Sequence, residues 1–152
     1  MPIEKYPASS NEEVMGSLAR ALHEKGGDEV IPFIASLFEK LGSRAGSKLK
    51  QKMGQCDFKS AVTTFFSSAL KAQPPRAEFL ELTDDKLVIK AFTCRIGLFG
   101  AGRELCKAIM ELDREIISQI AGEKIDMQIE KSLAAGDDCC LIRFQLKPGE
   151  NK

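Results

Sequence analysis

The stretch TCRIGLFGAGRELC, residues 93–106, joins two segments that have different hydrophobic patterns. Before it, KLVIKAF (residues 86–92) alternates polar and apolar side chains, which is the pattern of a half-buried strand. After it, apolar side chains recur at helical spacing until Gly122, a residue type that commonly ends helices. The sequence therefore predicts a strand, a glycine-rich loop and a long helix over residues 103–121. The helix face that we expect to be buried consists of Leu105, Ile109, Leu112, Ile116 and Ile120.

The part of the chain that precedes this unit, about residues 9–73, is predicted to be helical. Ser9 or Ser10, each followed by a glutamate three residues later, can form a capping box that starts the first of three helices. Gly42 and Gly46 are expected to bend or interrupt the second helix. The predicted apolar faces are Val14, Leu18, Ala21 and Leu22 in the first helix, Ile31, Ile34, Leu37, Phe38 and Leu41 in the second, and Phe58, Val62, Phe65, Phe66, Ala69 and Leu70 in the third.

In the second part, about residues 77–147, the sequence predicts two β-hairpins, one on each side of the long helix. The first hairpin covers residues 78–93 and the second covers residues 124–147, and both alternate polar and apolar side chains. Two hairpins that flank a helix favour one mostly antiparallel sheet with helices on its covered face. We therefore predict a single α+β domain over residues 1–152, in which N-terminal helices precede the hairpin, helix and hairpin.

The overall composition is that of an ordinary globular domain, with 43% hydrophobic and 29% charged residues. The 22 basic and 22 acidic side chains cancel, which argues against a dedicated nucleic-acid-binding protein. The basic segment LGSRAGSKLKQK (residues 41–52) is interpreted as a solvated helix face. No apolar run is long enough to span a membrane, and MPIEKYPASS lacks a signal-peptide core, so we expect a cytoplasmic protein.

The glycines of the loop, Gly97, Gly100 and Gly102, do not form a known nucleotide-binding motif. Their order is G-x-x-G-x-G, whereas the dinucleotide fingerprint is G-x-G-x-x-G within a parallel βαβ unit. The chain also lacks the G-x-x-x-x-G-K-[ST] motif of a P-loop. The glycines are therefore interpreted as a connection that needs positive φ angles and a close approach to the sheet.

Cys94 and Cys106 flank this loop and are the first candidates for thiol chemistry. Five cysteines without a secretory signal do not indicate a structural disulfide framework. Cys106 is expected in the first turns of the helix, where the helix dipole, together with Arg95 and Arg103, would lower the pKa of its thiol. A short glycine-rich loop would allow the two thiols to meet, which suggests a redox switch. The alternative is that each cysteine is a small buried hydrophobic residue.

The adjacent pair Cys139 and Cys140 is expected to point to opposite faces of the last strand. Cys140 shares its face with clearly apolar residues and is predicted to be buried, whereas Cys139 is predicted to lie nearer solvent and to act as a third thiol. Cys94, Cys106 and Cys139 are the candidate ligands of a three-thiolate metal site, although their spacing matches no zinc motif. The sequence leaves three possibilities for a cofactor: none, an Fe–S cluster or a bound apolar ligand.

Asp113 follows Cys106 by two helical turns, on the same helix face. An aspartate in this position can change the pKa of the Cys106 thiol or form the end of a pocket. The alternative is that Asp113 lies on an exposed face of the helix. His23 is the single histidine and lies far from the cysteines in the sequence. Because no acid–base pair with a specific spacing is evident, we expect a binding protein and not an enzyme.

From residue 93 onward, the chain resembles the C-terminal half of the 4-vinyl reductase domain superfamily. That superfamily has a cysteine after the second strand, a cysteine early in the helix, and a G-D-x-x-C turn before the last strand. The corresponding residues here are Cys94, Cys106, Gly136, Asp137 and Cys140. LFEKLGSRAGSKL (residues 37–49) is similar to the methanogen output version, and the aminothiazoline-carboxylate hydrolase-like family is a more distant branch. The chain departs from many relatives in having Ser132 instead of a cysteine and Arg95 instead of a proline.

This resemblance implies an archaeal, cytoplasmic homodimer with a mixed fold related to subunits of a vesicle-tethering complex. The implied function is non-catalytic binding of a small hydrocarbon- or lipid-like molecule, or thiol redox sensing with a redox partner, in intracellular signalling or regulation. The alternatives are a hydrolase of the aminothiazoline-carboxylate type, and an Fe–S or metal-binding protein. The expected ligand- or redox-binding residues are Cys94, Cys106, Cys139, Cys140, Arg103 and Asp113.

Overall fold

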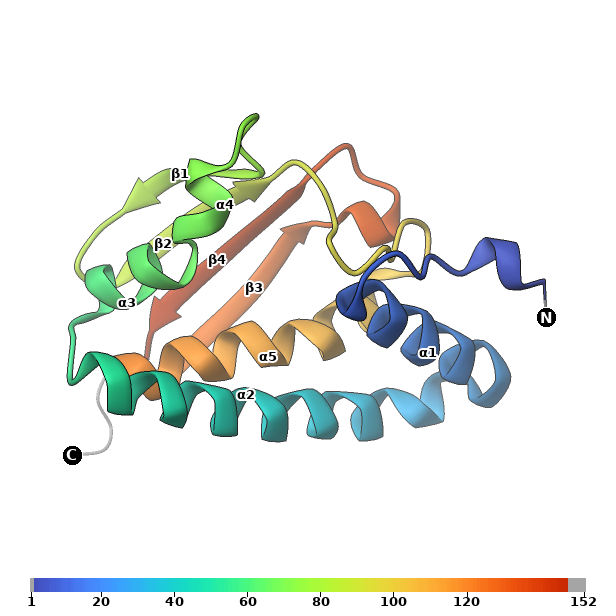
Figure 1. Cartoon of the computed structure of the whole chain (residues 1–152), viewed down its shortest axis with the longest axis horizontal. Coiled ribbons are helices and arrows are strands. Elements are labelled where there is room, and N and C mark those ends of the chain that lie inside the picture. Colours follow the sequence, from blue (N-terminus) through green and yellow to red (C-terminus); the bar gives the residue numbers. More distant parts are fainter. Residues whose placement is uncertain (1, 148–152) are drawn as a thin grey trace.

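The computed structural model describes residues 2–147 and confirms the α+β architecture (Figure 1). Helices precede a hairpin, a long helix and a second hairpin, as the sequence predicts. The helices are η1 (Ile3–Lys5), α1 (Asn11–Gly26), η2 (Gly27–Val30), α2 (Ile31–Met53), α3 (Phe58–Phe65), α4 (Ser67–Lys71), α5 (Arg103–Ala121) and η3 (Leu133–Ala135). The strands are β1 (Ala77–Leu82), β2 (Lys86–Ala91), β3 (Ile125–Lys131) and β4 (Cys140–Leu146).

The two hairpins form one antiparallel sheet with the strand order β1-β2-β4-β3. The central strands β2 and β4 place Leu87 opposite Phe144 and Ile89 opposite Ile142. These four side chains are buried, because every second residue of each strand faces the helices. No helix among the described residues is both long and apolar enough to cross a membrane.

Helices α3, α4 and α5 cover one face of the sheet (Figure 1). On α5, the predicted buried face is confirmed at Leu105, Ile109, Ile116 and Ile120, whereas Leu112 is half-buried. The third predicted helix is divided in two at Phe66. The centroid of the Phe66 ring lies 4.8 Å, 6.1 Å and 5.9 Å from the ring centroids of Phe65, Phe79 and Phe144. The break between the two helices therefore places a cluster of aromatic side chains over the sheet.

Helix α2 packs against α5 through two glycines, and here the sequence prediction was wrong. Gly42 and Gly46 do not bend or interrupt α2, which continues from Ile31 to Met53. A Cβ atom at Gly42 would lie 2.6 Å from the Leu112 carbonyl oxygen, and one at Gly46 would lie 2.7 Å from Gln119 Cβ. The glycines are therefore required for space, because they let the two helix backbones approach more closely than side chains would allow.

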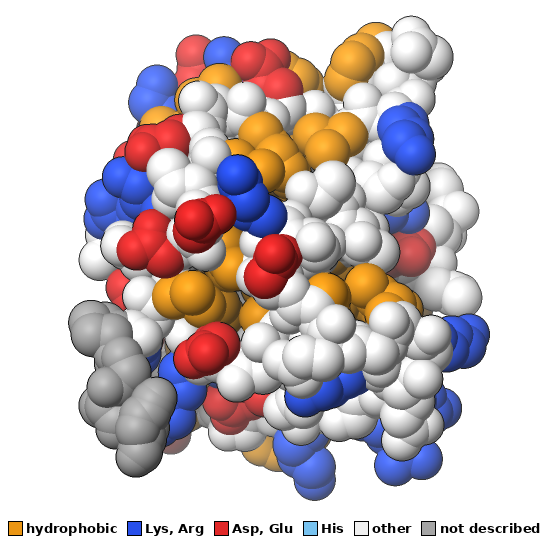
Figure 2. Space-filling model, turned by 90° about the vertical axis from the view of Figure 1, so that its left-hand side faces the viewer, with side chains coloured by type: hydrophobic (Ala, Val, Ile, Leu, Met, Phe, Trp, Pro, Cys, Tyr) orange, Lys and Arg blue, Asp and Glu red, His pale blue; other side chains and the backbone are white. Residues whose placement is uncertain are grey.

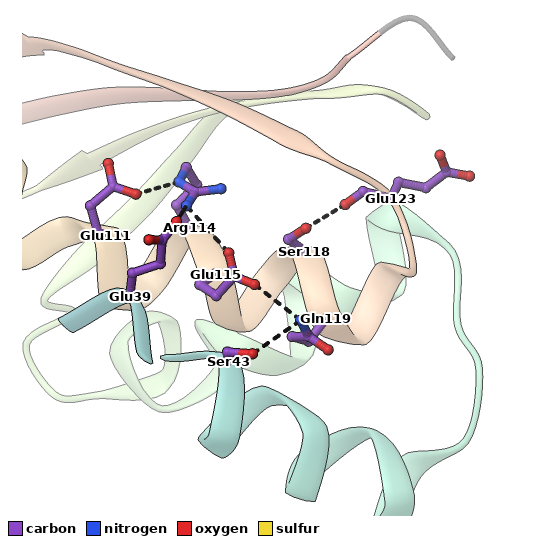
Figure 3. Close-up of polar contacts among 8 residues, drawn as sticks. All are labelled: Glu39, Ser43, Glu111, Arg114, Glu115, Ser118, Gln119 and Glu123. Atoms are coloured by element: carbon purple, nitrogen blue, oxygen red, sulfur yellow. Dashed lines mark hydrogen bonds and ion pairs between the residues drawn. The ribbon is translucent and has the colours of Figure 1, made fainter. Parts of the chain in front are cut away.

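A polar network borders this helix contact (Figure 3). Arg114 donates from Nε to Glu111 at 2.6 Å and from Nη2 to Glu39 of α2 at 3.0 Å and to Glu115 at 3.2 Å. Gln119 then donates to Glu115 at 3.0 Å and to Ser43 of α2 at 3.4 Å. The network fixes the rotation of α5 relative to α2, since these partners meet in only one register.

Most of the predicted apolar face of α1 and part of that of α2 are exposed. On α1 the buried residues are Gly16 and Ala19, while Leu18 is 67% exposed and Val14 and Leu22 are also exposed. On α2, Ile34 and Phe38 are buried as predicted, but Leu37 and Leu41 are exposed together with Phe33. These six exposed side chains, which we call the helix stripe, are Val14, Leu18, Leu22, Phe33, Leu37 and Leu41. At the opposite end of the molecule, Figure 2 shows separate apolar patches bordered by charges of both signs.

We expect Gly42→Ala and Gly46→Ala each to lower the free energy of unfolding by about 1–3 kcal/mol, because the added methyl group overpacks the contact. In an exposed helix the same change would raise stability by about 1 kcal/mol, since alanine is the better helix former. Denaturant-induced unfolding measures both variants against Arg44→Ala, an exposed control on α2. A gain of stability in the glycine variants would contradict the close contact.

Candidate functional site

A cavity of about 350 Å³ lies between the sheet and the helices that cover it. Its size is within the usual range for small-molecule sites. The wall combines residues of the helices α1 to α5 and of the strands β1, β2 and β4 with the loop between β2 and α5, and most of it is apolar. Its larger apolar side chains include Phe38, Phe65, Phe66, Ile89, Leu98, Ile109 and Ile142.

The glycine-rich loop forms one side of this cavity. Cys94, Ile96 and Leu98 line the wall, and Gly97, Gly100 and Gly102 all have positive φ angles, as predicted. The predicted close approach of these glycines to the sheet is wrong, because a Cβ atom at Gly97 would meet Pro7 and one at Gly100 or Gly102 would meet nothing within 4 Å. The Gly102 N–H donates to the Ala134 carbonyl at 2.8 Å, so the end of the loop is tied to the turn before β4.

Three cysteines from different elements meet at the cavity: Cys94 from the loop, Cys106 from α5 and Cys140 from β4. All are free thiols. The Leu98 N–H donates to Cys94 Sγ, and the Leu133 N–H donates to Cys140 Sγ, each at 3.4 Å. With Asp113, four of the six predicted site residues therefore line the same cavity.

The thiol of Cys106 is not activated, which corrects the prediction of a stabilised thiolate. Burial raises its pKa to about 11, and hydrogen bonding with the Ser132 side chain opposes this only in part. Burial also raises the pKa of Cys140. Arg103 does not line the cavity, because its guanidinium donates to the carbonyls of Ile129 and Glu130 and lies 3.8 Å from Asp137. Desolvation therefore outweighs any effect of the helix N-terminus.

Cys139 is buried and does not belong to the cavity wall, so the prediction that it lies nearer solvent is wrong. The strand begins only at Cys140, and the alternation of faces therefore does not extend to Cys139. Within residues 2–147, no group of three or more Cys, His, Asp or Glu side chains is arranged to hold a metal ion. The suggested site of Cys94, Cys106 and Cys139 is not assembled.

Asp113 is the one predicted site residue that places a carboxyl group on the cavity wall. Its side chain keeps a limited accessible surface, but dense protein surrounds it. No hydrogen bond or ion pair to its carboxyl group is found among the described residues, and desolvation raises its pKa to about 7. Asp113 can therefore gain or lose a proton near neutral pH, inside a mostly apolar space.

Sequence reasoning missed the charged residues that reach the wall from more exposed positions. Glu12 of α1 lies 3.9 Å from Arg95 of the loop, and Arg76, just before β1, donates to Ser68 at 3.5 Å. Arg95 was considered only as a partner of Cys106. No local pattern marks Glu12 or Arg76, since these residues meet the cavity only through the tertiary fold.

The model of the L-2-amino-thiazoline-4-carboxylic acid hydrolase family matches residues 8–144. The chain belongs to this family. The match includes α1, the glycine-rich loop, Asp113 and most of β4, so the whole cavity wall lies within it. No curated protein gives a significant match to the sequence.

Solved structures confirm the fold at low sequence identity. The phenol-responsive sensory domain of the transcription activator PoxR, crystallised with phenol, is 14% identical with a TM-score of 0.61, over 92% of this chain and 76% of that one. Trafficking protein particle complex subunit 3 from Naegleria fowleri, covalently bound to palmitic acid, is 17% identical with a TM-score of 0.54, over 90% of this chain and 93% of that one.

We expect Asp113→Asn to raise the free energy of unfolding at pH 8 by about 2–4 kcal/mol, because the variant removes the cost of burying an ionised carboxylate. The pKa of Asp113 is raised in the folded state, so this cost grows as pH rises from about 4 to 7 and is complete above pH 7. The gain should be smaller at pH 5. Denaturant-induced unfolding at both pH values measures it, with Asp126→Asn on the exposed face of β3 as the control. A gain that is equal at pH 5 and pH 8 would show that Asp113 is not desolvated.

Proposed function

We propose that this chain binds a small molecule in the cavity and hydrolyses it there, with L-2-amino-thiazoline-4-carboxylic acid or a close relative as the substrate. The observation that carries the proposal is the unpaired carboxyl group of Asp113 on the wall of an apolar cavity, in a chain of this hydrolase family. A carboxyl group that titrates near neutral pH is well suited to exchange a proton with a substrate or with water.

The chemistry of the substrate fits the charges around the cavity. Its ring carbon between nitrogen and sulfur resembles an amidine carbon, to which water can add before the carbon–sulfur bond breaks and leaves a thiol. Asp113 would exchange protons with the amidine nitrogens or the water. Arg76 and Arg95, which reach the wall from more exposed positions, would pair with the carboxylate of the substrate.

A second candidate is ligand sensing without catalysis, and the mostly apolar wall favours it. The two structural neighbours hold phenol and palmitic acid, and a related role here would agree with the resemblance of the chain to the 4-vinyl reductase superfamily. Thiol redox sensing has less support, because the pKa values of Cys106 and Cys140 are raised and both thiols stay protonated at neutral pH.

Incubation of the purified protein with the aminothiazoline carboxylate should yield a product heavier by one water molecule, detected by mass spectrometry. Asp113→Asn should lower kcat/KM by about 100-fold or more, since general acid–base groups commonly contribute that much. Asp126→Asn should leave the rate unchanged. Stabilisation by phenol or a fatty acid, with no product formed from the aminothiazoline, would favour the sensing function instead.

We also propose that the protein forms a homodimer through the helix stripe of α1 and α2. The stripe repeats every fourth residue on each helix and contains Leu18, 67% exposed, and Phe33, 57% exposed. Large apolar side chains that stay exposed on consecutive turns of a helix are typical of a protein–protein interface.

Leu18→Glu combined with Leu37→Glu should therefore convert a dimer into a monomer, because each charge would be buried against an apolar partner surface. Light scattering coupled to size-exclusion chromatography measures the mass over a range of concentrations. Leu80→Glu, an equally exposed change on β1, is the matched control and should leave the dimer intact. A monomeric parent protein at every concentration would rule out the homodimer.

A further inference from the structure

We infer that the N-terminal segment, residues 2–10, controls access to the cavity by holding the glycine-rich loop between β2 and α5 in its closed position. The inference rests on the proposal that the cavity is the binding site, and it adds a means of regulating how a ligand reaches that site. The observations behind it are the position of the opening and the contacts that hold the loop there.

The cavity opens where the loop begins. Of the residues that line the wall, Ser68, Thr93 and Arg95 are exposed, whereas the others are buried or half-buried. Ser68 belongs to α4, while Thr93 and Arg95 belong to the first part of the loop. The opening therefore lies between α4 and the loop, and an outward movement of the loop would widen it.

The two ends of the loop are fixed to the rest of the domain. The Phe92 N–H donates to the Arg76 carbonyl at 2.9 Å, and the Gly102 N–H donates to the Ala134 carbonyl at 2.8 Å. Between these points, the glycines of the loop supply backbone freedom that other residues lack. The middle of the loop can therefore move while its ends stay in place.

The N-terminal segment lies against the middle of the loop, on the side away from the cavity. Ile96 and Leu98 line the cavity wall, whereas Pro7 does not. A Cβ atom at Gly97 would lie 2.9 Å from Pro7 Cγ, so Pro7 is in direct contact with the loop backbone (Figure 1). Pro7 therefore blocks outward movement of the loop at this point.

The segment is itself held on α1 by a small set of polar contacts. The Tyr6 hydroxyl donates to Glu24 Oε1 at 2.5 Å, and Lys5 Nζ lies 3.2 Å from Glu24 Oε2. Ser17 Oγ donates to the Pro7 carbonyl at 2.6 Å. Within residues 2–10, Tyr6 is the residue that is buried. Loss of these contacts would release Pro7 from the loop without removing any side chain from the main core.

Glu24 also connects the segment to the tip of the loop. Arg20 donates from Nε to Glu24 Oε2 and from Nη1 to the Phe99 carbonyl, both at 3.2 Å. The hydrogen bond from Tyr6 holds the pKa of Glu24 below its usual range, so the carboxylate is ionised at neutral pH and its hydrogen bonds are charge-assisted. Loss of the Tyr6 hydroxyl would therefore weaken the attachment of the segment and the positioning of Arg20 together.

Cys94 can report the opening of the loop without any knowledge of the ligand. Its half-buried thiol lies on the cavity wall, and its Sγ accepts a hydrogen bond from the Leu98 N–H at 3.4 Å. Because both partners belong to the loop, exposure of this thiol depends on the loop conformation. Alkylation by iodoacetamide, followed by peptide mass spectrometry, measures its accessibility. Cys56 is a half-buried internal reference, since its thiol lies 4.0 Å from the Ile120 carbonyl at the other end of α5.

We expect Tyr6→Phe in the full chain to raise the alkylation rate of Cys94 about tenfold, because a hydrogen bond to a charged group commonly shifts an equilibrium by at least that factor. Arg20→Met should also raise the rate. Ile3→Ala is the matched control in the same segment, because the Ile3 side chain is 71% exposed, and it should leave the rate unchanged. Hydrogen exchange should become faster in peptides that cover residues 93–102 and stay slow in those that cover β4.

An unchanged alkylation rate of Cys94 in Tyr6→Phe, with unchanged exchange in the loop, would overturn the inference. An equal rise at Cys94, at Cys56 and in β4 would also overturn it, because the variant would then have lowered the stability of the whole fold. Failure to hydrolyse the aminothiazoline carboxylate would contradict the hydrolase proposal alone, since the alkylation of Cys94 requires no substrate.

Discussion

The close contact between α2 and α5 at Gly42 and Gly46 is the constraint on which the rest of the structure depends. It brings the backbone of α2 against Leu112 and Ile116 of α5, and the polar network around Arg114 sets the rotation of the two helices. With α5 held from this side, its apolar face is turned to the sheet and Asp113 is turned to the cavity. The geometry of the candidate site is therefore set at a helix interface that borders it.

A second close contact completes the cavity. A Cβ atom at Gly16 of α1 would lie 2.3 Å from the carbonyl oxygen of Ile96, so α1 lies directly on the loop that forms one side of the wall. Met15 and Glu12 consequently reach the cavity from α1. The site is thus built by the approach of distant backbones and not by a local motif, which explains why no recognised binding motif occurs in the sequence.

The predictable parts of the fold are those in which one residue pattern has one physical meaning. Alternation in β3 and β4, and the helical repeat of α5, specified the sheet and its covering helix correctly. A glycine in a helix, by contrast, can either bend the helix or make room for a close neighbour. The role of Gly42 became clear only from the position of α5 beside it. Apolar periodicity in α1 did not reveal that Leu18 is uncovered, because the pattern does not identify the covering surface. For Asp113, helical spacing indicated the correct face, but its isolation from every cation depends on tertiary packing.

The adjacency of Asp113 and Arg114 has a consequence for how the chain can vary in length. One residue inserted into α5 before Asp113 would rotate the following turns by about 100° relative to the preceding ones. The rotation would carry both side chains away from their present surroundings and would separate Leu112 from Ile116 at the glycine contact. We therefore expect insertions and deletions in the part of α5 that carries these contacts to be disfavoured by two independent requirements. Length changes can be accommodated instead in the turn between β1 and β2 and in the segment between α4 and β1, which leave α5 in register.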